Sequence, residues 1–344
     1  MMRDRPTTPR RRRLTMLAVG ALGVIAVTLG AAAAASAAPT WTNAAPPTSP
    51  SARGYSSMAY DARHGQLLLF GGYDGHAMLT GTWRWTGSTW MDLAPVKSPS
   101  HRDAAALGYD AATKQLILFG GYTYDSVAAL HRDTWLWTGT TWRKLAPKKS
   151  PPKRFGAAMA YDAASKQLLL FGGLKNTQGG FLNDTWVWTG STWKQLFPRR
   201  HPPAVATQMT YDPLRKRIVL FGDTMPAATW LWNGKNWSKR TTSTAPHARY
   251  GSTLTFDPAL GKVILFGGVP LPTGYPVDGL ADTWAWNGTR WTRLTVATAP
   301  PGRTAAAAAY DRRTKRLVLF GGLNRLFDIY GDGSVLGDTW TFGG

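Results

Sequence analysis

The sequence contains no cysteine and no glutamate, so all 19 acidic residues among its 344 are aspartate. The lack of cysteine excludes a disulfide scaffold, a zinc site built on thiolates and a thiol nucleophile. The lack of glutamate means that any mechanism based on two carboxylates has only aspartate to use. Histidine is scarce as well. The six histidines fall in expected loops without the spacing of a ligand pair, so we expect no metal site and no cofactor.

Positive charge, glycine and tryptophan are abundant instead. The chain has 40 Lys and Arg residues and a formal net charge of +21 at pH 7. A hydrophobic fraction of 44% with only 17% charged residues is typical of a folded domain rather than a disordered polyelectrolyte. A basic surface attracts anionic partners, although it specifies none of them.

The N-terminus has the features of an export signal. Arg10–Arg13 precede an uncharged stretch from Leu14 to Ala38, and Ala35-Ser36-Ala37 supplies a small-residue cleavage motif. We therefore expect residues 1–37 to be a signal peptide that is cleaved after Ala37, which makes the protein secreted or extracytoplasmic. The uncharged stretch also exceeds the roughly 20 residues that a helix needs to span a bilayer. An uncleaved membrane anchor is the alternative.

Six copies of one unit fill the single domain expected over residues 38–344. Each unit has a Tyr-Asp or Phe-Asp pair, and a Phe follows the aromatic residue of the pair ten positions later. The spacing between successive copies of this Phe is 45 to 54 residues, a period typical of propeller arrays. The units lie near residues 47–95, 96–147, 148–198, 199–242, 243–296 and 297–344, with 40–46 added to the last.

Each unit is expected to form four short strands. A strand of small residues ends in Tyr-Asp, an apolar strand such as Gln66–Phe70 follows, and two strands rich in threonine and tryptophan complete the unit. Phe-Gly-Gly closes the second strand, as at Phe70–Gly72, and Asp-Thr-Trp begins the third, as at Asp133–Trp135. These motifs resemble the kelch repeat, and the resemblance implies an all-β, six-bladed β-propeller like the central domain of galactose oxidase. The copper and thioether-linked tyrosine chemistry of that enzyme needs a cysteine, which this chain lacks.

The two ends of the chain predict how the ring closes. The sixth unit stops at Gly344 after three strands, whereas residues 40–46 match the fourth strands of other units, such as residues 89–95. We expect this N-terminal segment to supply the last strand of the sixth blade. Closure in this way leaves no open sheet edge that could template aggregation.

All 17 tryptophans recur with the repeat, which indicates a role in the core. None is left over for stacking against sugars or bases, so we expect no nucleic-acid ligand. The aspartates of the six Tyr-Asp and Phe-Asp pairs are expected to cap tight turns.

Five arginines recur seven residues before the aromatic residue of these pairs: Arg53, Arg102, Arg154, Arg249 and Arg303. They are the candidate ligand-binding residues. We expect them at the mouth of the axial channel, where a ring of guanidinium groups would attract a carboxylate, phosphate or sulfate. The resemblance implies the same role, because arginines at this position contact the ligand in kelch domains that bind acidic peptides.

The alternative for these arginines is a structural ion pair. Four aspartates begin third strands at the same end of the blades: Asp133, Asp184, Asp282 and Asp338. The fourth unit has Ala204 and Ala228 in place of both partners, which favours pairing. The first unit has Gly81 in place of the aspartate, so Arg53 is the expected unpaired guanidinium.

Long connections between second and third strands fall at this same end, and loops on a rigid scaffold are where function usually lies. We therefore expect a monomeric binding module that docks an anionic polymer or an acidic protein segment, with membrane contact only if the signal stays uncleaved. The sequence shows no catalytic constellation. The alternative is a carbohydrate-active hydrolase or lyase that uses loop aspartates of the same face. These aspartates are Asp74, Asp125, Asp278, Asp328 and Asp332.

Overall fold

The structure is a computed structural model that describes residues 38–124, 128–178, 180–204, 207–222, 227–271, 277–326 and 334–343. The segment expected to be a signal peptide, residues 1–37, lies outside the described residues. All regular secondary structure within the described ranges is β-strand. No helix with the length and apolar character needed to cross a membrane is found in those ranges.

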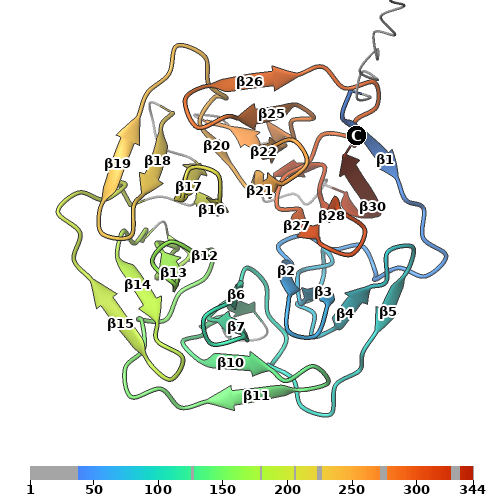
Figure 1. Ribbon diagram of the computed structural model, residues 1–344. Coiled ribbons are helices and arrows are strands. Elements are labelled where there is room, and N and C mark those ends of the chain that lie inside the picture. Colours follow the sequence, from blue (N-terminus) through green and yellow to red (C-terminus); the bar gives the residue numbers. More distant parts are fainter. Residues whose placement is uncertain are drawn as a thin grey trace, which may run out of the picture. The chain divides into compact units, whose positions relative to one another are not determined.

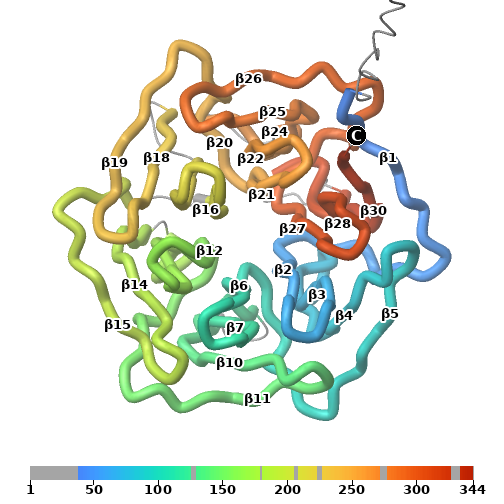
Figure 2. Tube along the Cα trace, viewed as in Figure 1, coloured from blue at the N-terminus to red at the C-terminus, as the bar shows by residue number. Residues whose placement is uncertain are grey.

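Six four-stranded antiparallel sheets surround a central axis (Figure 1). The first strand of each sheet lies next to the axis and the fourth lies at the rim, as the trace in Figure 2 also shows. The protein is therefore an all-β, six-bladed β-propeller, and the fold predicted from the repeats is confirmed.

The first three blades follow one another along the chain. Blade one contains β2 (Ser57–Asp61), β3 (Gln66–Phe70), β4 (Thr82–Trp85) and β5 (Trp90–Asp92). Blade two contains β6 (Ala106–Asp110), β7 (Gln115–Phe119), β10 (Thr134–Trp137) and β11 (Trp142–Leu145). Blade three contains β12 (Ala158–Asp162), β13 (Gln167–Phe171), β14 (Thr185–Trp188) and β15 (Trp193–Leu196).

The other three blades complete the ring. Blade four contains β16 (Thr207–Asp212), β17 (Arg217–Gly222), β18 (Thr229–Trp232) and β19 (Trp237–Arg240). Blade five contains β21 (Thr253–Asp257), β22 (Lys262–Phe266), β25 (Thr283–Trp286) and β26 (Trp291–Leu294). Blade six contains β27 (Ala307–Asp311), β28 (Arg316–Leu323), β30 (Val335–Gly343) and β1 (Thr40–Asn43).

The N-terminal strand closes the ring, as the chain ends predicted. β1 pairs with β30 in antiparallel register, with Thr40 opposite Gly343 and Asn43 opposite Trp340. The regular strand is shorter than the matching segment 40–46, because it ends at Asn43. Trp41 of β1 is 1% exposed and packs against Phe342 of blade six and Phe266 of blade five. The first strand of the domain thus joins its last two blades.

The second strand of each blade forms the centre of the core. In β3 the residues Leu67 to Phe70 are all at most 1% exposed, because neighbouring blades cover both faces of the sheet. A strand that is buried on both faces needs a continuous apolar run, and the six second strands supply one each. First strands carry small side chains where the blades converge on the axis, as at Ala106 and Ala158.

The six aspartates that end the first strands cap the turns that follow, which confirms their predicted role. Asp110 is 1% exposed, and its Oδ1 accepts hydrogen bonds from the backbone N–H groups of Ala112 and Thr113. Equivalent backbone contacts occur at Asp61, Asp162, Asp212, Asp257 and Asp311. These carboxylates are occupied by their own turns.

A ring of side-chain hydrogen bonds joins the blades. A tryptophan of each fourth strand donates its indole Nε1–H to a threonine of the third strand of the preceding blade, at 2.8 to 3.2 Å. The pairs are Trp90–Thr339, Trp142–Thr82, Trp193–Thr134, Trp237–Thr185, Trp291–Thr229 and Trp41–Thr283. All six contacts are buried, so the tryptophans act in the core, as their periodicity indicated.

Candidate functional site

The two faces of the ring differ. We call the face that carries the connections between second and third strands the loop face, and the opposite face, with the turns between first and second strands, the turn face. Loop-face connections contain extra strand pairs: β8 (Tyr122–Tyr124) with β9 (Ala128–Leu130), and β20 (Arg249–Tyr250) with β23 (Val269–Pro270). A third pair, β24 (Val277–Asp278) with β29 (Arg325–Leu326), joins the loops of blades five and six.

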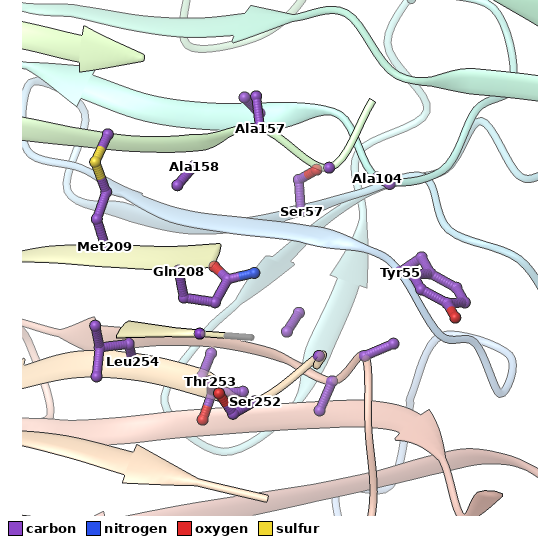
Figure 3. Close-up of a pocket in the computed structure, with 18 of the residues that line it drawn as sticks. Tyr55, Ser57, Ala104, Ala157, Ala158, Gln208, Met209, Ser252, Thr253 and Leu254 are labelled. Carbon is purple, nitrogen blue, oxygen red and sulfur yellow. The ribbon is translucent and has the colours of Figure 1, made fainter. Parts of the chain in front are cut away.

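The axial channel is lined by residues of all six blades (Figure 3). Its walls consist largely of alanine, glycine and serine, with larger side chains such as Gln208, Met209 and Leu254. The cavity measures about 190 Å³, below the range of about 300–1,000 Å³ typical of small-molecule sites. Neither a carboxylate nor a histidine is among its described lining residues. The ionisable residues of the described lining are Tyr55, Arg249 and Tyr250.

Four of the five candidate arginines are locked to aspartate. In blade three, Arg154 Nη1 lies 2.6 Å from Asp184 Oδ1, and Nη2 lies 2.8 Å from Oδ2. Nη1 also donates to the carbonyl of Gly172, and Nε donates to the carbonyl of Pro152. The same bidentate pairing occurs at Arg102–Asp133, Arg249–Asp282 and Arg303–Asp338.

These four arginines do not offer free guanidinium groups to a ligand, and the structural alternative holds for them. Each has 0 to 1% of its side-chain surface exposed. A guanidinium that is buried to this degree needs a counter-charge and a full set of acceptors, and each blade supplies both. Of the two interpretations left open by the sequence, an anion-binding ring and a structural ion pair, the ion pair applies to these four arginines.

The aspartates of these pairs are shifted toward their charged form. Burial favours the neutral carboxyl, but the hydrogen bonds and charge of the arginine outweigh it, so the pKa of Asp184 lies below its ordinary value. Asp133, Asp282 and Asp338 shift in the same direction for the same reasons. Because these pKa values are lower in the folded protein than in the unfolded chain, the pairs stabilise the fold above the ordinary aspartate pKa. Their contribution is lost as the pH falls through the lowered values.

Each residue of the Asp-Thr-Trp motif makes a different side-chain contact. In blade three, Asp184 binds Arg154, and Thr185 accepts the indole N–H of Trp237 from the next blade. Trp186 donates its own Nε1–H to Asp184 Oδ2 at 2.7 Å. Each residue of the motif therefore satisfies a different buried group.

Arg53 differs from the other four. It is 4% exposed, and its guanidinium donates to the carbonyls of Ser51 and Gly71 and to Ser51 Oγ. No carboxylate in the described part of the chain forms an ion pair with it. Burial lowers the pKa of Arg53 to about 10, although the charges of Asp74 and Asp92 act in the opposite direction. The expectation that Arg53 lacks an aspartate partner agrees with this geometry.

The loop aspartates considered for catalysis are used in other ways where they are described. Asp74 Oδ1 accepts the backbone N–H groups of His76 and Ala77, so it caps its own turn. Asp278 Oδ1 accepts a hydrogen bond from Arg325 Nε at 2.7 Å. Asp125, Asp328 and Asp332 lie outside the described residues. No group of three or more histidines and carboxylates that could hold a metal ion is found in the described ranges.

Asp103 on the loop face belongs to no repeated motif of the sequence. It follows Arg102 directly, is 9% exposed, and its Oδ1 has no hydrogen-bond partner among the described residues. Burial raises its pKa to about 7. The only signal in the sequence is a charged residue at a position where other described blades carry Gly54, Phe155, Tyr250 or Thr304.

The raised pKa of Asp103 predicts a pH-dependent stability difference. Because the folded pKa lies above the unfolded value of about 3.9, the folded state binds this proton more tightly, and stability falls as the pH rises from about 4 to above 7. Asp103→Asn is expected to stabilise the protein by about 4 kcal/mol at pH 8 and by much less at pH 4. Thermal unfolding of both proteins at pH 4, 6 and 8 measures this. An equal effect at all three values would contradict it.

Comparisons with known proteins agree with the fold. The sequence matches no family model and no curated protein. Among solved structures, one titled "Structure of YjhT" is similar, with a TM-score of 0.63 and 14% sequence identity. The alignment covers 87% of this chain and 99% of that chain. At this identity the similarity shows the fold alone, and by its fold the chain is a β-propeller.

Proposed function

We propose that the protein is an exported binding module whose loop face docks an anionic polymer or an acidic protein segment. The propeller fold suits a binding or scaffold role because it presents loops on a rigid frame. Within this proposal the protein is a monomer outside the cytoplasm, released by cleavage after Ala37.

The distribution of charge carries the proposal. Six aspartates are occupied by turns and four by ion pairs with arginine, so more than half of the 19 acidic residues are used inside the fold. Only five of the 40 Lys and Arg residues are buried within the described ranges. The accessible surface is therefore more positive than the composition suggests, and such a surface attracts anions over long distances.

Exposed cations lie on the loop face near the arginine–aspartate pairs. Arg132 precedes Asp133, Lys153 precedes Arg154, and Lys175 follows the loop-face bridge between Phe155 and Leu174. All three cations are exposed. We propose that they, rather than the buried arginines, make the first contacts with the partner.

A binding panel tests this function. Heparin, polyglutamate and neutral polysaccharides are titrated into the protein at low salt and at about 0.5 M salt, where screening shortens the range of charge interactions to a few ångströms. We expect polyanion binding that is at least tenfold weaker at the higher salt, and no polymer cleavage. Cleavage of a polysaccharide would favour the carbohydrate-active alternative, and salt-independent binding of a neutral sugar would refute the proposal.

Two matched triple variants test which face binds. The first is Arg132→Gln, Lys153→Gln and Lys175→Gln on the loop face. The second is Lys114→Gln, Lys166→Gln and Lys315→Gln, which removes the same charge from exposed turn-face positions. Only the first variant is expected to weaken polyanion binding strongly. Equal loss in both would show that net charge, not the loop face, determines binding.

A further inference from the structure

Four blades show a repeated carboxylate-binding arrangement. We call the arginine, the third-strand tryptophan and the carboxylate between them a node. In blade three, Asp184 receives hydrogen bonds from Arg154 Nη1 at 2.6 Å, Arg154 Nη2 at 2.8 Å and Trp186 Nε1 at 2.7 Å. The nodes of blades two, five and six have the same three donors around Asp133, Asp282 and Asp338.

Blade one keeps the donors of this node and lacks the carboxylate. Arg53 and Trp83 occupy the equivalent positions, but Gly81 stands where the aspartate would be. The indole Nε1 of Trp83 is buried and has no hydrogen-bond partner in the described part of the chain. A Cβ built on Gly81 would lie 2.7 Å from Trp83 Nε1 and 3.5 Å from Arg53 Nη1. Both donors therefore face the place of the missing side chain.

The node of blade four shows that loss of the aspartate need not leave a buried charge. There Ala204 replaces the arginine and Ala228 the aspartate, so both charges are removed together. Blade one alone, among the described nodes, retains a buried guanidinium without a carboxylate. Asp74 and Asp92 act on Arg53 through their charge, without an ion pair in the described part of the chain. An anion from outside that contacts the guanidinium directly would therefore stabilise it further.

The position of the missing carboxylate in blade one is accessible to solvent. In the complete nodes the arginine is 0 to 1% exposed, whereas the aspartate side chain is 13 to 28% exposed. The carboxylate position thus lies at the surface, with the donors behind it. The 2.7 Å between Trp83 Nε1 and the Cβ position means that the indole must move back when residue 81 itself carries a side chain.

We propose that the node of blade one is a carboxylate-binding site, and that an aspartate or glutamate side chain of an acidic protein segment fills it. This inference deepens the proposed function and rests on it for the identity of the partner. A planar carboxylate accepts the two guanidinium N–H groups side by side, as the four aspartates do. Sulfate also binds a guanidinium through two oxygens, so the titration below compares the two classes of anion.

The indole N–H signal of Trp83 in a ¹⁵N–¹H NMR spectrum gives a direct test. The signal is assigned by its loss in Trp83→Phe, and the protein is titrated with acetate, a tetra-aspartate peptide, or sulfate at matched ionic strength. We expect a saturable shift with acetate and with the peptide, the peptide acting at a lower concentration, and no saturable shift with sulfate. Equal affinity for acetate and the peptide would overturn the assignment to a protein side chain. The same shift with sulfate would overturn the assignment to a carboxylate, and no shift with either carboxylate would overturn the site.

A pair of variants provides an independent control. Gly81→Asp places the carboxylate on the chain, so it is expected to abolish the acetate response and to raise the melting temperature by about 2–4 °C. Ala228→Asp makes the equivalent change in blade four, where Ala204 stands at the position of the arginine. This variant is expected to have a lower melting temperature. A drop with Gly81→Asp as large as that with Ala228→Asp would contradict the proposal.

The site and the proposed function can fail separately. If Trp83 responds to carboxylates but no polyanion binds in the panel, the site stands and the proposed function falls. If polyanions bind equally well to the wild type and to Gly81→Asp while Trp83 shows no response, the function stands and the site falls.

Discussion

A chain that lacks residues 38–46 is expected to lose most of its folding stability and to become largely insoluble. The deletion removes β1, with four backbone pairs to β30 and the Trp41–Thr283 hydrogen bond. Trp41 is 1% exposed, and truncating a buried tryptophan alone costs about 3–5 kcal/mol. Loss of the whole strand should cost more than about 5 kcal/mol, a large part of the about 5–15 kcal/mol typical of a domain. The exposed edge of β30 would then be free to pair between molecules.

Soluble yield and thermal unfolding measure the effect of this deletion, and a permuted chain is its control. The permuted chain begins at Ala44 and carries residues 38–43 after Gly344. Because Thr40 lies opposite Gly343, Gly344 with residues 38 and 39 would form a three-residue hairpin connection. We expect the permuted chain to recover the stability that the deletion loses. A deletion variant that melts at the wild-type temperature would show that ring closure by β1 is not required.

Gly120→Ala is expected to destabilise the protein far more than Gly65→Ala. Both glycines have positive φ, +70° and +63°, so both changes carry a backbone strain of about 1–2 kcal/mol. A Cβ at Gly120 would also lie 2.5 Å from the backbone oxygen of Arg154 in the next blade, whereas a Cβ at Gly65 meets only the Tyr60 hydroxyl, at 3.9 Å. The backbone contact adds overpacking, so we expect a total of about 3–5 kcal/mol for Gly120→Ala.

The turn position of Gly65 is occupied by other residues in other blades. Other blades carry lysine with positive φ at the position of Gly65, as at Lys114 and Lys166, so an L-residue is tolerated in that turn. Denaturant unfolding of the two variants should show a loss of about 1–2 kcal/mol for Gly65→Ala and at least twice that for Gly120→Ala. Equal losses would mean that the contact between blades at Gly120 and Arg154 contributes little.

The reason for the Phe-Gly-Gly motif appears in the same contact. Gly121 N–H donates to the carbonyl of Arg154 at 2.9 Å, and Gly72, Gly268 and Gly322 make the equivalent bond to the next blade. The first glycine allows the close approach, and the second supplies the donor. The motif could be recognised in the sequence, but the contact that requires it lies about 33 residues further along the chain, between Gly121 and Arg154, and could not be seen there.

The sequence did not determine whether the repeated arginines face solvent or pair with aspartate. Their period and the matching aspartates were visible in the sequence, and so was the exception at Arg53 and Gly81. Whether Arg154 faces solvent or Asp184 depends on a distance between two strands of one blade, and the repeat pattern is the same in either case. Burial decides between them, because a guanidinium that is 0% exposed must be paired. Asp103 had no repeat pattern to reveal it.

The amino-acid sequence by itself determined the number of blades, the closing strand within residues 40–46, and the roles of the turn aspartates. These features follow from local patterns, namely apolar runs, turn residues and a recurring unit, which the chain specifies without reference to distant contacts. Only the tertiary structure decided which charged side chains pair, as Arg154 does with Asp184, and which have no carboxylate partner among the described residues, as Arg53 does. The protonation and pairing of a buried group depend on the neighbours that folding brings together and on the exclusion of water around them. The spacing of residues along the chain determines neither the neighbours nor the exclusion of water.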